Sequence, residues 1–256
     1  MDYLKKTVEN GICTLTLNRP DKRNALNTEL LEELNHQLDE ISINEEIRAL
    51  VLTGEGKAFC AGGDIQTMIS RLGKAYITKE RLEKLLHSIV VKIQGMKKPS
   101  LAVVNGSCFG AGIVLATACD LIIASENAKF GFAYGNVGLI SEASYHLVRY
   151  MGLQRAKYLV FGRKTISASQ AKEFGLVLDV VPHEALASFS KEILTEWANG
   201  PRATIGLSKQ LLNAAMDNHL EEQLRLESAY QGVAFTTDEH KEGVSAFLEK
   251  RKPEFP

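Results

Sequence analysis

The stretch FGAGIVLATACD, residues 109–120, joins a glycine-rich turn directly to an apolar helix. An apolar strand, SLAVVNG (100–106), precedes it, and a second, DLIIAS (120–125), follows it. The order strand, loop, helix, strand is typical of an α/β fold. Near the start of the helix, where a catalytic acid or base could stand, the sequence has Val114. Either the catalytic acid or base has been lost from this site, or it lies elsewhere in the sequence.

The same order of strand, loop and helix recurs three times before residue 125, so we expect loops to converge on one edge of an α/β fold. The expected strands cover residues 3–8, 12–18, 48–54, 100–106 and 120–125. The glycine-rich segments 54–65 and 105–112 and the segment 130–144 are expected to be loops. Leucine and isoleucine spacing predicts a helix capped by Thr28 and another over about 78–96.

The chain has 256 residues, of which 45% are hydrophobic and 24% are charged, with a net charge of −1. This balance indicates one globular domain and argues against a nucleic-acid partner. Four cysteines without C-x-x-C spacing are expected to be buried thiols in a reducing compartment. We expect no signal peptide, no membrane span and a cytoplasmic location.

Helical signals dominate from residue 153 onward, and no linker-like stretch divides the chain. We therefore predict one domain, with an α/β core over 1–195 and a helical C-terminal oligomerisation region over 196–256. That region carries more apolar side chains than a peripheral arm should expose, which predicts a homo-oligomer. These residues are Leu211, Leu212, Leu220, Leu224, Leu226, Phe235, Phe247 and Leu248.

Two glycine loops, each placed after a strand, could bind an anionic oxygen. Ala61 to Asp64 forms one, and Gly110 to Gly112 forms the other at the start of a helix. Glycine lets a ligand approach the backbone, and a helix start presents unpaired N–H groups. One N–H from each loop could hold a carbonyl oxygen that becomes an enolate. Tight turns alone would also explain these glycines, and neither loop matches a P-loop or a dinucleotide-binding motif.

Six segments stand out in order along nearly the whole chain: RPDKRNALN (19–27), GKAFCAGGDI (56–65), KKPSLAVVNGSCFGAG (97–112), ACDLIIASENAKFGF (118–132), SASQAKEFGLVLDVV (167–181) and EGVSAFLEKRKPEF (242–255). Together they resemble the enoyl-CoA hydratase/isomerase (crotonase) superfamily. The resemblance implies a spiral of β-β-α turns with a helical C-terminal trimerisation region. It also implies a homotrimer or a dimer of trimers.

The resemblance further implies an acyl-CoA thioester substrate whose carbonyl is polarised by the N–H groups of Gly63 and Ala111. Coenzyme A enters only as part of that substrate, and we expect no separate cofactor and no metal. The residues that match the family's substrate-binding part are Arg23, Ala25, Ala61, Asp64, Ile65 and Gly110. An RNA-binding branch of the family uses a lysine-rich helix, whereas the matching helix here, residues 28–47, is acidic.

The two glutamates of the family's hydratases match Val114 and Tyr134, neither of which is a carboxylic acid. Glu142 stands eight residues after Tyr134, where related dienoyl-CoA isomerases and chlorobenzoyl-CoA dehalogenases carry a functional aspartate. The dehalogenases also have an aromatic residue matching Tyr134 and a histidine matching His87. Each of these residues also has a simpler interpretation. Glu142 could be a solvated loop acid, Tyr134 a wall of the acyl site, and His87 a surface or helix-packing histidine.

These matches favour an acyl-CoA enzyme that forms a thioester enolate and shuttles a proton, as an isomerase does, over an ordinary hydratase. Glu142, Tyr134 and His87 are the candidate catalytic residues. The alternatives are an enoyl-CoA hydratase, a dehalogenase-like aryl-CoA enzyme, or a non-catalytic acyl-CoA-binding subunit.

Overall fold

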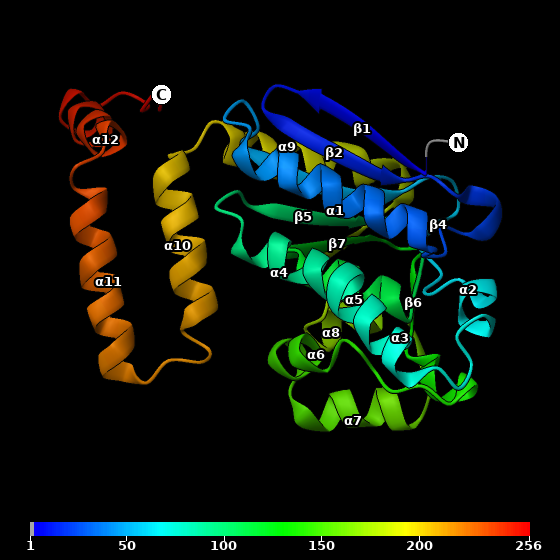
Figure 1. Cartoon of the computed structure of the whole chain (residues 1–256). Helices are drawn as coiled ribbons and strands as arrows, with labels where there is room; N and C mark the ends of the chain where they lie inside the picture. The colour runs from blue at the N-terminus through cyan, green and yellow to red at the C-terminus, as the bar shows by residue number, and fades with distance from the viewer. Residues whose placement is uncertain (1–2) are drawn as a thin grey trace.

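Within residues 3–256, which the computed structural model describes, the larger β-sheet holds six strands in the order β1-β2-β3-β5-β7-β10 (Figure 1). Met1 and Asp2, the first residues of the predicted core, lie outside the described residues. The strands are β1 (Leu4–Glu9), β2 (Ile12–Leu17), β3 (Ala49–Gly54), β5 (Ser100–Val104), β7 (Leu121–Ser125) and β10 (Asp179–Val181). The predicted pairing of the first two strands is confirmed and is antiparallel, and the other neighbours run parallel.

Short strands form a second sheet in the order β4-β6-β8-β9. They are β4 (Ala58–Cys60), β6 (Ser107–Phe109), β8 (Lys129–Gly131) and β9 (Thr165–Ser167). Along the chain, β3, β5 and β7 are followed by β4, β6 and β8, and each pair leads into a helix. This is the predicted spiral of β-β-α turns. The expectation of unbroken loops over 54–65, 105–112 and 130–144 is wrong, because strands of three residues are too short to show an alternating pattern.

The first long helix, α1 (Thr28–Ile43), begins at Thr28, the residue predicted to cap it, so its N-cap lies one residue earlier. The Asn27 side chain, not that of Thr28, accepts a hydrogen bond from the backbone N–H of Leu30 (3.2 Å) and so caps the helix. Asparagine is among the strongest N-cap residues. The leucine face predicted from the sequence is buried against the sheet and α4 (Ser88–Gly95).

The helix predicted over 78–96 is built from three pieces. They are α3 (Ala75–Arg81), a π-helical turn (Leu82–His87) and α4. A π turn adds one residue to a helical turn and is frequent at functional sites. It places His87 at the junction with α4, exposed to solvent.

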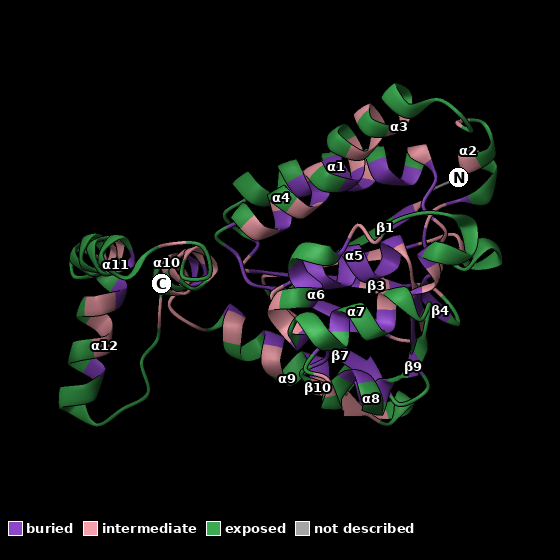
Figure 2. Ribbon diagram, turned by 90° about the horizontal axis from the view of Figure 1, so that it is seen from below, coloured by how far each residue is buried: buried purple, intermediate pink, exposed green. Residues whose placement is uncertain are grey.

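The helix α5 (Ala111–Ala118) lies at the centre of the molecule, and all eight of its residues are buried (Figure 2). It packs on α4, β6 and the strands β4 and β5. A helix surrounded on every side has no polar face, which is why its sequence is apolar throughout. Val114, on this helix, is 1% exposed.

The C-terminal half is mainly helical, as predicted. Its elements are α6 (Ser144–Met151), α7 (Leu153–Phe161), α8 (Ala168–Glu173), α9 (Leu186–Ala198), α10 (Arg202–Ala214), α11 (Leu220–Ala234) and α12 (Asp238–Glu249). Helix α9 spans the predicted boundary at residue 195 and packs on the large sheet. The last three helices project from the core as an arm, with α11 and α12 farthest from it (Figures 1 and 2).

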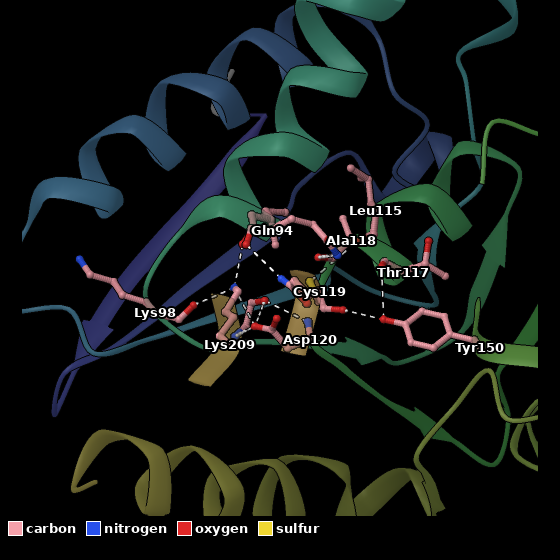
Figure 3. A network of polar contacts seen from close by, with 12 residues as sticks. Gln94, Lys98, Leu115, Thr117, Ala118, Cys119, Asp120, Tyr150 and Lys209 are labelled. Atoms are coloured by element: carbon pink, nitrogen blue, oxygen red, sulfur yellow. Dashed lines mark hydrogen bonds and ion pairs between the residues drawn. The ribbon is translucent and has the colours of Figure 1, made fainter. Parts of the chain in front are cut away.

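One buried lysine ties the arm to the core (Figure 3). The Nζ atom of Lys209, on α10, forms an ion pair of 2.8 Å with Asp120, and it donates hydrogen bonds to the carbonyl oxygens of Ile93 and Lys98. Asp120 also accepts from the N–H and the hydroxyl of Ser100 on β5. The side chains of Lys209 and Asp120 are 6% and 20% exposed, so this network replaces lost hydration with protein partners.

No helix within residues 3–256 combines the length and the apolar character needed to cross a membrane. All four cysteines are buried free thiols, as the sequence predicts.

Replacing Lys209 by methionine should destabilise the fold strongly. The change leaves the Asp120 carboxylate and two backbone carbonyls without their cationic partner, and removing one member of a buried pair typically costs about 3–5 kcal/mol. Urea unfolding measures the difference. Lys241→Met is the matched control, because that lysine forms an exposed pair with Asp238 and its loss should leave the unfolding free energy unchanged. Equal stability of the two variants would contradict the anchoring role of Lys209.

Candidate active site

The two glycine loops meet where β4 and β6 end. A Cβ atom at Gly62 would lie 2.9 Å from the carbonyl oxygen of Phe109 and 3.5 Å from the backbone nitrogen of Ala111. Gly62 has φ +97° and Gly110 has φ +53°, both in the region that favours glycine. The glycines therefore serve two purposes at once: they form the turns, and they let the two backbones touch.

The backbone N–H groups of Gly63 and Ala111 have no hydrogen-bond partner in the described part of the chain. The N–H of Leu26 donates to the carbonyl oxygen of Gly62, and the carbonyl oxygen of Leu26 accepts from the N–H of Asp64. The N–H of Gly63, which lies between these two bonds, therefore points away from Leu26. Ala111 is the first residue of α5, and the first N–H groups of a helix have no partner within it. Because a Cβ at Gly62 would lie only 3.5 Å from the backbone nitrogen of Ala111, the two loops approach closely and one unpaired donor from each lies in the same region.

Tyr134 packs against these loops from the segment after β8. The residue is 7% exposed, and its hydroxyl donates a hydrogen bond of 2.8 Å to the carbonyl oxygen of Gly110. Burial raises the pKa of this phenol well above its ordinary value, so the hydroxyl stays protonated and remains a donor. The hydroxyl of Tyr134, a candidate catalytic residue, therefore fixes the turn that begins α5.

Glu142 lies in the segment between the 3₁₀ helix Ala133–Val137 and α6, and its side chain is half-buried. It is close enough to Tyr134 for its charge to act on that phenol. Burial raises the pKa of the Glu142 carboxyl, while the charges of His87, Arg71 and Arg81 oppose this rise. Within residues 3–256 the carboxylate has no hydrogen-bond partner, so its oxygens are free to take a proton.

Asp64 follows Gly63 and is engaged within the protein. One carboxylate oxygen pairs with Arg19 at 2.9 Å, and the other accepts from the backbone N–H groups of Gln66 and Thr67 at the start of α2 (Ile65–Ile69). Burial opposes ionisation, but these donors outweigh it and lower the pKa of Asp64. Its carboxylate fixes the loop that carries Gly63.

The other predicted substrate-binding residues surround the same loop. The N–H of Ala61 donates to the carbonyl oxygen of Arg23 (2.9 Å), and Arg19 donates to the carbonyl oxygen of Ala25. The side chain of Arg23 is exposed, as is that of Ile65. Within residues 3–256 there is no cluster of three or more His, Cys, Asp or Glu side chains that could hold a metal.

The family model described as enoyl-CoA hydratase/isomerase matches residues 7–256. The chain belongs to this family. It is 38% identical to the 1,2-epoxyphenylacetyl-CoA isomerase of Escherichia coli, over all of this chain and 98% of that protein. It is 34% identical to the short-chain-enoyl-CoA hydratase of Clostridium acetobutylicum, over 96% and 94% of the two chains. The solved structure of an enoyl-CoA hydratase from Mycobacterium smegmatis has a TM-score of 0.94 at 33% identity, covering 100% of this chain and 99% of that one.

These relatives confirm the crotonase-like fold predicted for the enzyme. They include an isomerase and a hydratase, so the family alone does not choose between the two reactions.

A groove of about 690 Å³ lies between the end of α1 and the arm, and no predicted site residue lines it.

Arg71 and Arg81 are the residues near Glu142 that the sequence did not single out. Arg71 follows α2 in a stretch without a recognised motif, and Arg81 ends α3, near the start of the helix predicted over about 78–96. Only the fold brings their charges within electrostatic reach of the Glu142 carboxyl. His87, predicted from the dehalogenase match, is exposed but within electrostatic reach of Glu142.

Proposed function

We propose that this family member isomerises the double bond of an enoyl-CoA thioester, with Glu142 as the group that moves the proton. The proposal rests on three groups that have no hydrogen-bond partner within residues 3–256. They are the backbone N–H groups of Gly63 and Ala111 and the half-buried carboxyl of Glu142. The similarity to an isomerase over the full chain supports it.

In this proposal the N–H groups of Gly63 and Ala111 bind the thioester oxygen. Glu142 takes a proton from the α-carbon of a 3-enoyl-CoA, and the electron pair moves to the oxygen as a dienolate. The Glu142 carboxyl, which is half-buried and so exchanges its proton with the solvent, then gives a proton to the γ-carbon, which yields the 2-enoyl-CoA. A pKa raised by burial suits both steps, because the carboxyl is then a stronger base and still gives the proton back.

Hydration would need a held and activated water molecule. Val114 and Tyr134 stand where the family's hydratases carry glutamates, and Val114 is buried among apolar side chains of the core. Tyr134 donates its hydroxyl to Gly110 and cannot serve as a base, because its pKa is raised. We therefore expect the enzyme to hydrate crotonyl-CoA slowly or not at all.

Glu142→Gln should lower the rate of enoyl-CoA isomerisation about 10²–10⁴-fold, the usual contribution of a general base, and leave acyl-CoA binding intact. The wild-type rate should fall as the pH drops through the raised pKa of Glu142, because only the ionised carboxyl accepts a proton. The variant should lack this acidic limb. Kinetics from pH 4 to pH 9 with a 3-enoyl-CoA measure both effects. Unchanged turnover in the variant, or rapid crotonyl-CoA hydration by the wild type, would contradict the proposal.

A proline at position 63 tests the proposed oxyanion hole, because it removes one N–H. A Cβ at Gly63 would lie 2.5 Å from Met68 Cε, so the test uses Gly63→Pro together with Met68→Ala, and Met68→Ala alone is the matched control. Losing one such donor typically costs about 10²–10³-fold in kcat. The double variant should lose this factor relative to the control. Equal turnover would remove Gly63 from the oxyanion hole.

We also propose that the chain assembles into a homotrimer or a dimer of trimers through its arm. Six of the predicted apolar side chains are at least half exposed in the single chain, which is unusual for a surface that stays in water. They are Leu212, Leu220, Leu224, Phe235, Phe247 and Leu248. Light scattering at micromolar concentration should give the mass of three or six chains, and the mass of one chain would contradict assembly.

A further inference from the structure

Helix α6 joins the Glu142 segment to the arm. Glu142 stands two residues before Ser144, the first residue of α6, so the first turn of this helix determines where Glu142 lies. The helix packs on α5, and the Tyr150 hydroxyl donates a hydrogen bond to the carbonyl oxygen of Cys119 (3.3 Å), directly after α5 ends. On another side, α6 contacts the connection between α10 and α11 (Figure 1). This helix therefore lies between α5 and the arm.

Asp217, in the connection between α10 and α11, makes the contact with α6. One carboxylate oxygen accepts a hydrogen bond from the Tyr145 hydroxyl (2.7 Å), and the other pairs with the Arg149 guanidinium (2.5 Å). The guanidinium lies over the Tyr145 ring, 3.4 Å from the ring centre, and donates to the carbonyl oxygen of the same residue. The three side chains thus form one connected set of contacts between the arm and α6.

These contacts add little to the stability of the fold. The Asp217 side chain is 54% exposed, and exposed ion pairs typically contribute about 0–1 kcal/mol. The buried pair of Lys209 and Asp120 already anchors the arm. What the contacts can supply is order at the start of α6. Among residues 3–256 no side chain caps this end, because its N-cap residue is Ala143, and alanine cannot accept from the first N–H groups of a helix.

We infer that Asp217 is a positioning residue for Glu142. Through Tyr145 and Arg149 it holds the start of α6, and so it fixes where the Glu142 carboxyl lies relative to the glycine loops. The inference rests on the proposed function, because it takes Glu142 as the group that moves the proton. Rates depend steeply on such placement, since an error of about 1 Å can lower a rate by about 10²-fold. The arm, predicted from the sequence for assembly, thereby also acts on the reaction.

Steady-state isomerisation of a 3-enoyl-CoA by Asp217→Ala tests the inference. The variant should lose about tenfold or more in kcat, because the Glu142 carboxyl is less well placed. Its KM and melting temperature should stay at the wild-type values, because the change touches neither the acyl-CoA contacts nor the core. The hydrogen bond from Tyr145 lowers the pKa of Asp217, so Asp217 is ionised at neutral pH. The acidic limb of the pH profile should therefore remain in Asp217→Ala and be absent from Glu142→Gln.

A double variant tests whether the two sides of the contact act together. Tyr145→Phe removes the hydrogen bond from the side of α6 and should also lower kcat. Tyr145→Phe combined with Asp217→Ala should be no slower than Asp217→Ala alone, because the hydroxyl has then already lost its acceptor. Additive losses, or a loss of kcat accompanied by a lower melting temperature, would overturn the inference.

Glu221→Ala is the matched control. Glu221 is an exposed acid of the arm that pairs with Arg225 within α11, so the variant should keep the wild-type kcat. Wild-type kcat in Asp217→Ala, or an equal loss in Glu221→Ala, would overturn the inference, and a slow Glu142→Gln would leave the proposed function standing. A wild type that does not isomerise, or a Glu142→Gln variant with wild-type turnover, would overturn the proposed function and the inference with it.

Discussion

The close approach of helix α5 to strand β4 is the constraint on which the site depends. A Cβ at Gly112 would lie 2.6 Å from the carbonyl oxygen of Cys60 and 2.9 Å from its Cβ, so only glycine allows the helix to sit this near. The contact places the start of α5 against the Gly62–Gly63 turn. Because all of α5 is buried, its position is fixed by packing on every side, and the unpaired N–H of Ala111 is fixed with it.

A second consequence concerns the electrostatics of the site. Val114 lies on an apolar helix, Tyr134 is a protonated phenol, and Asp64 is paired with Arg19, whereas the Glu142 carboxyl has no hydrogen-bond partner within residues 3–256. Burial raises its pKa, and the neighbouring cations limit the rise. A single carboxyl adjusted in this way can both take and return a proton. The substitution of Val114 and Tyr134 for acids is thus consistent with a change of reaction rather than with a loss of catalysis.

Much of this could be predicted from the sequence, and the rest has physical reasons for being missed. The long strands and helices have clear periodicity, and the glycine loops stand at their ends. Three-residue strands such as Ala58–Cys60 are too short to show a period. The N-cap of α1 is Asn27 and not the predicted Thr28, because two polar residues that can both cap a helix stand next to each other there. The hydrogen bond from Tyr134 to Gly110 and the electrostatic interaction of Arg81 with Glu142 join segments far apart in the chain, so no local pattern encodes them.

The central claim is that this enzyme moves protons on an acyl-CoA and does not add water. One mass-spectrometric measurement tests it: incubation of the wild-type enzyme with a short enoyl-CoA in D₂¹⁸O, followed by determination of the thioester's mass. The account predicts that deuterium enters the acyl chain with no gain of ¹⁸O. A product that has gained a complete heavy water molecule at a rate comparable with deuterium exchange would contradict it.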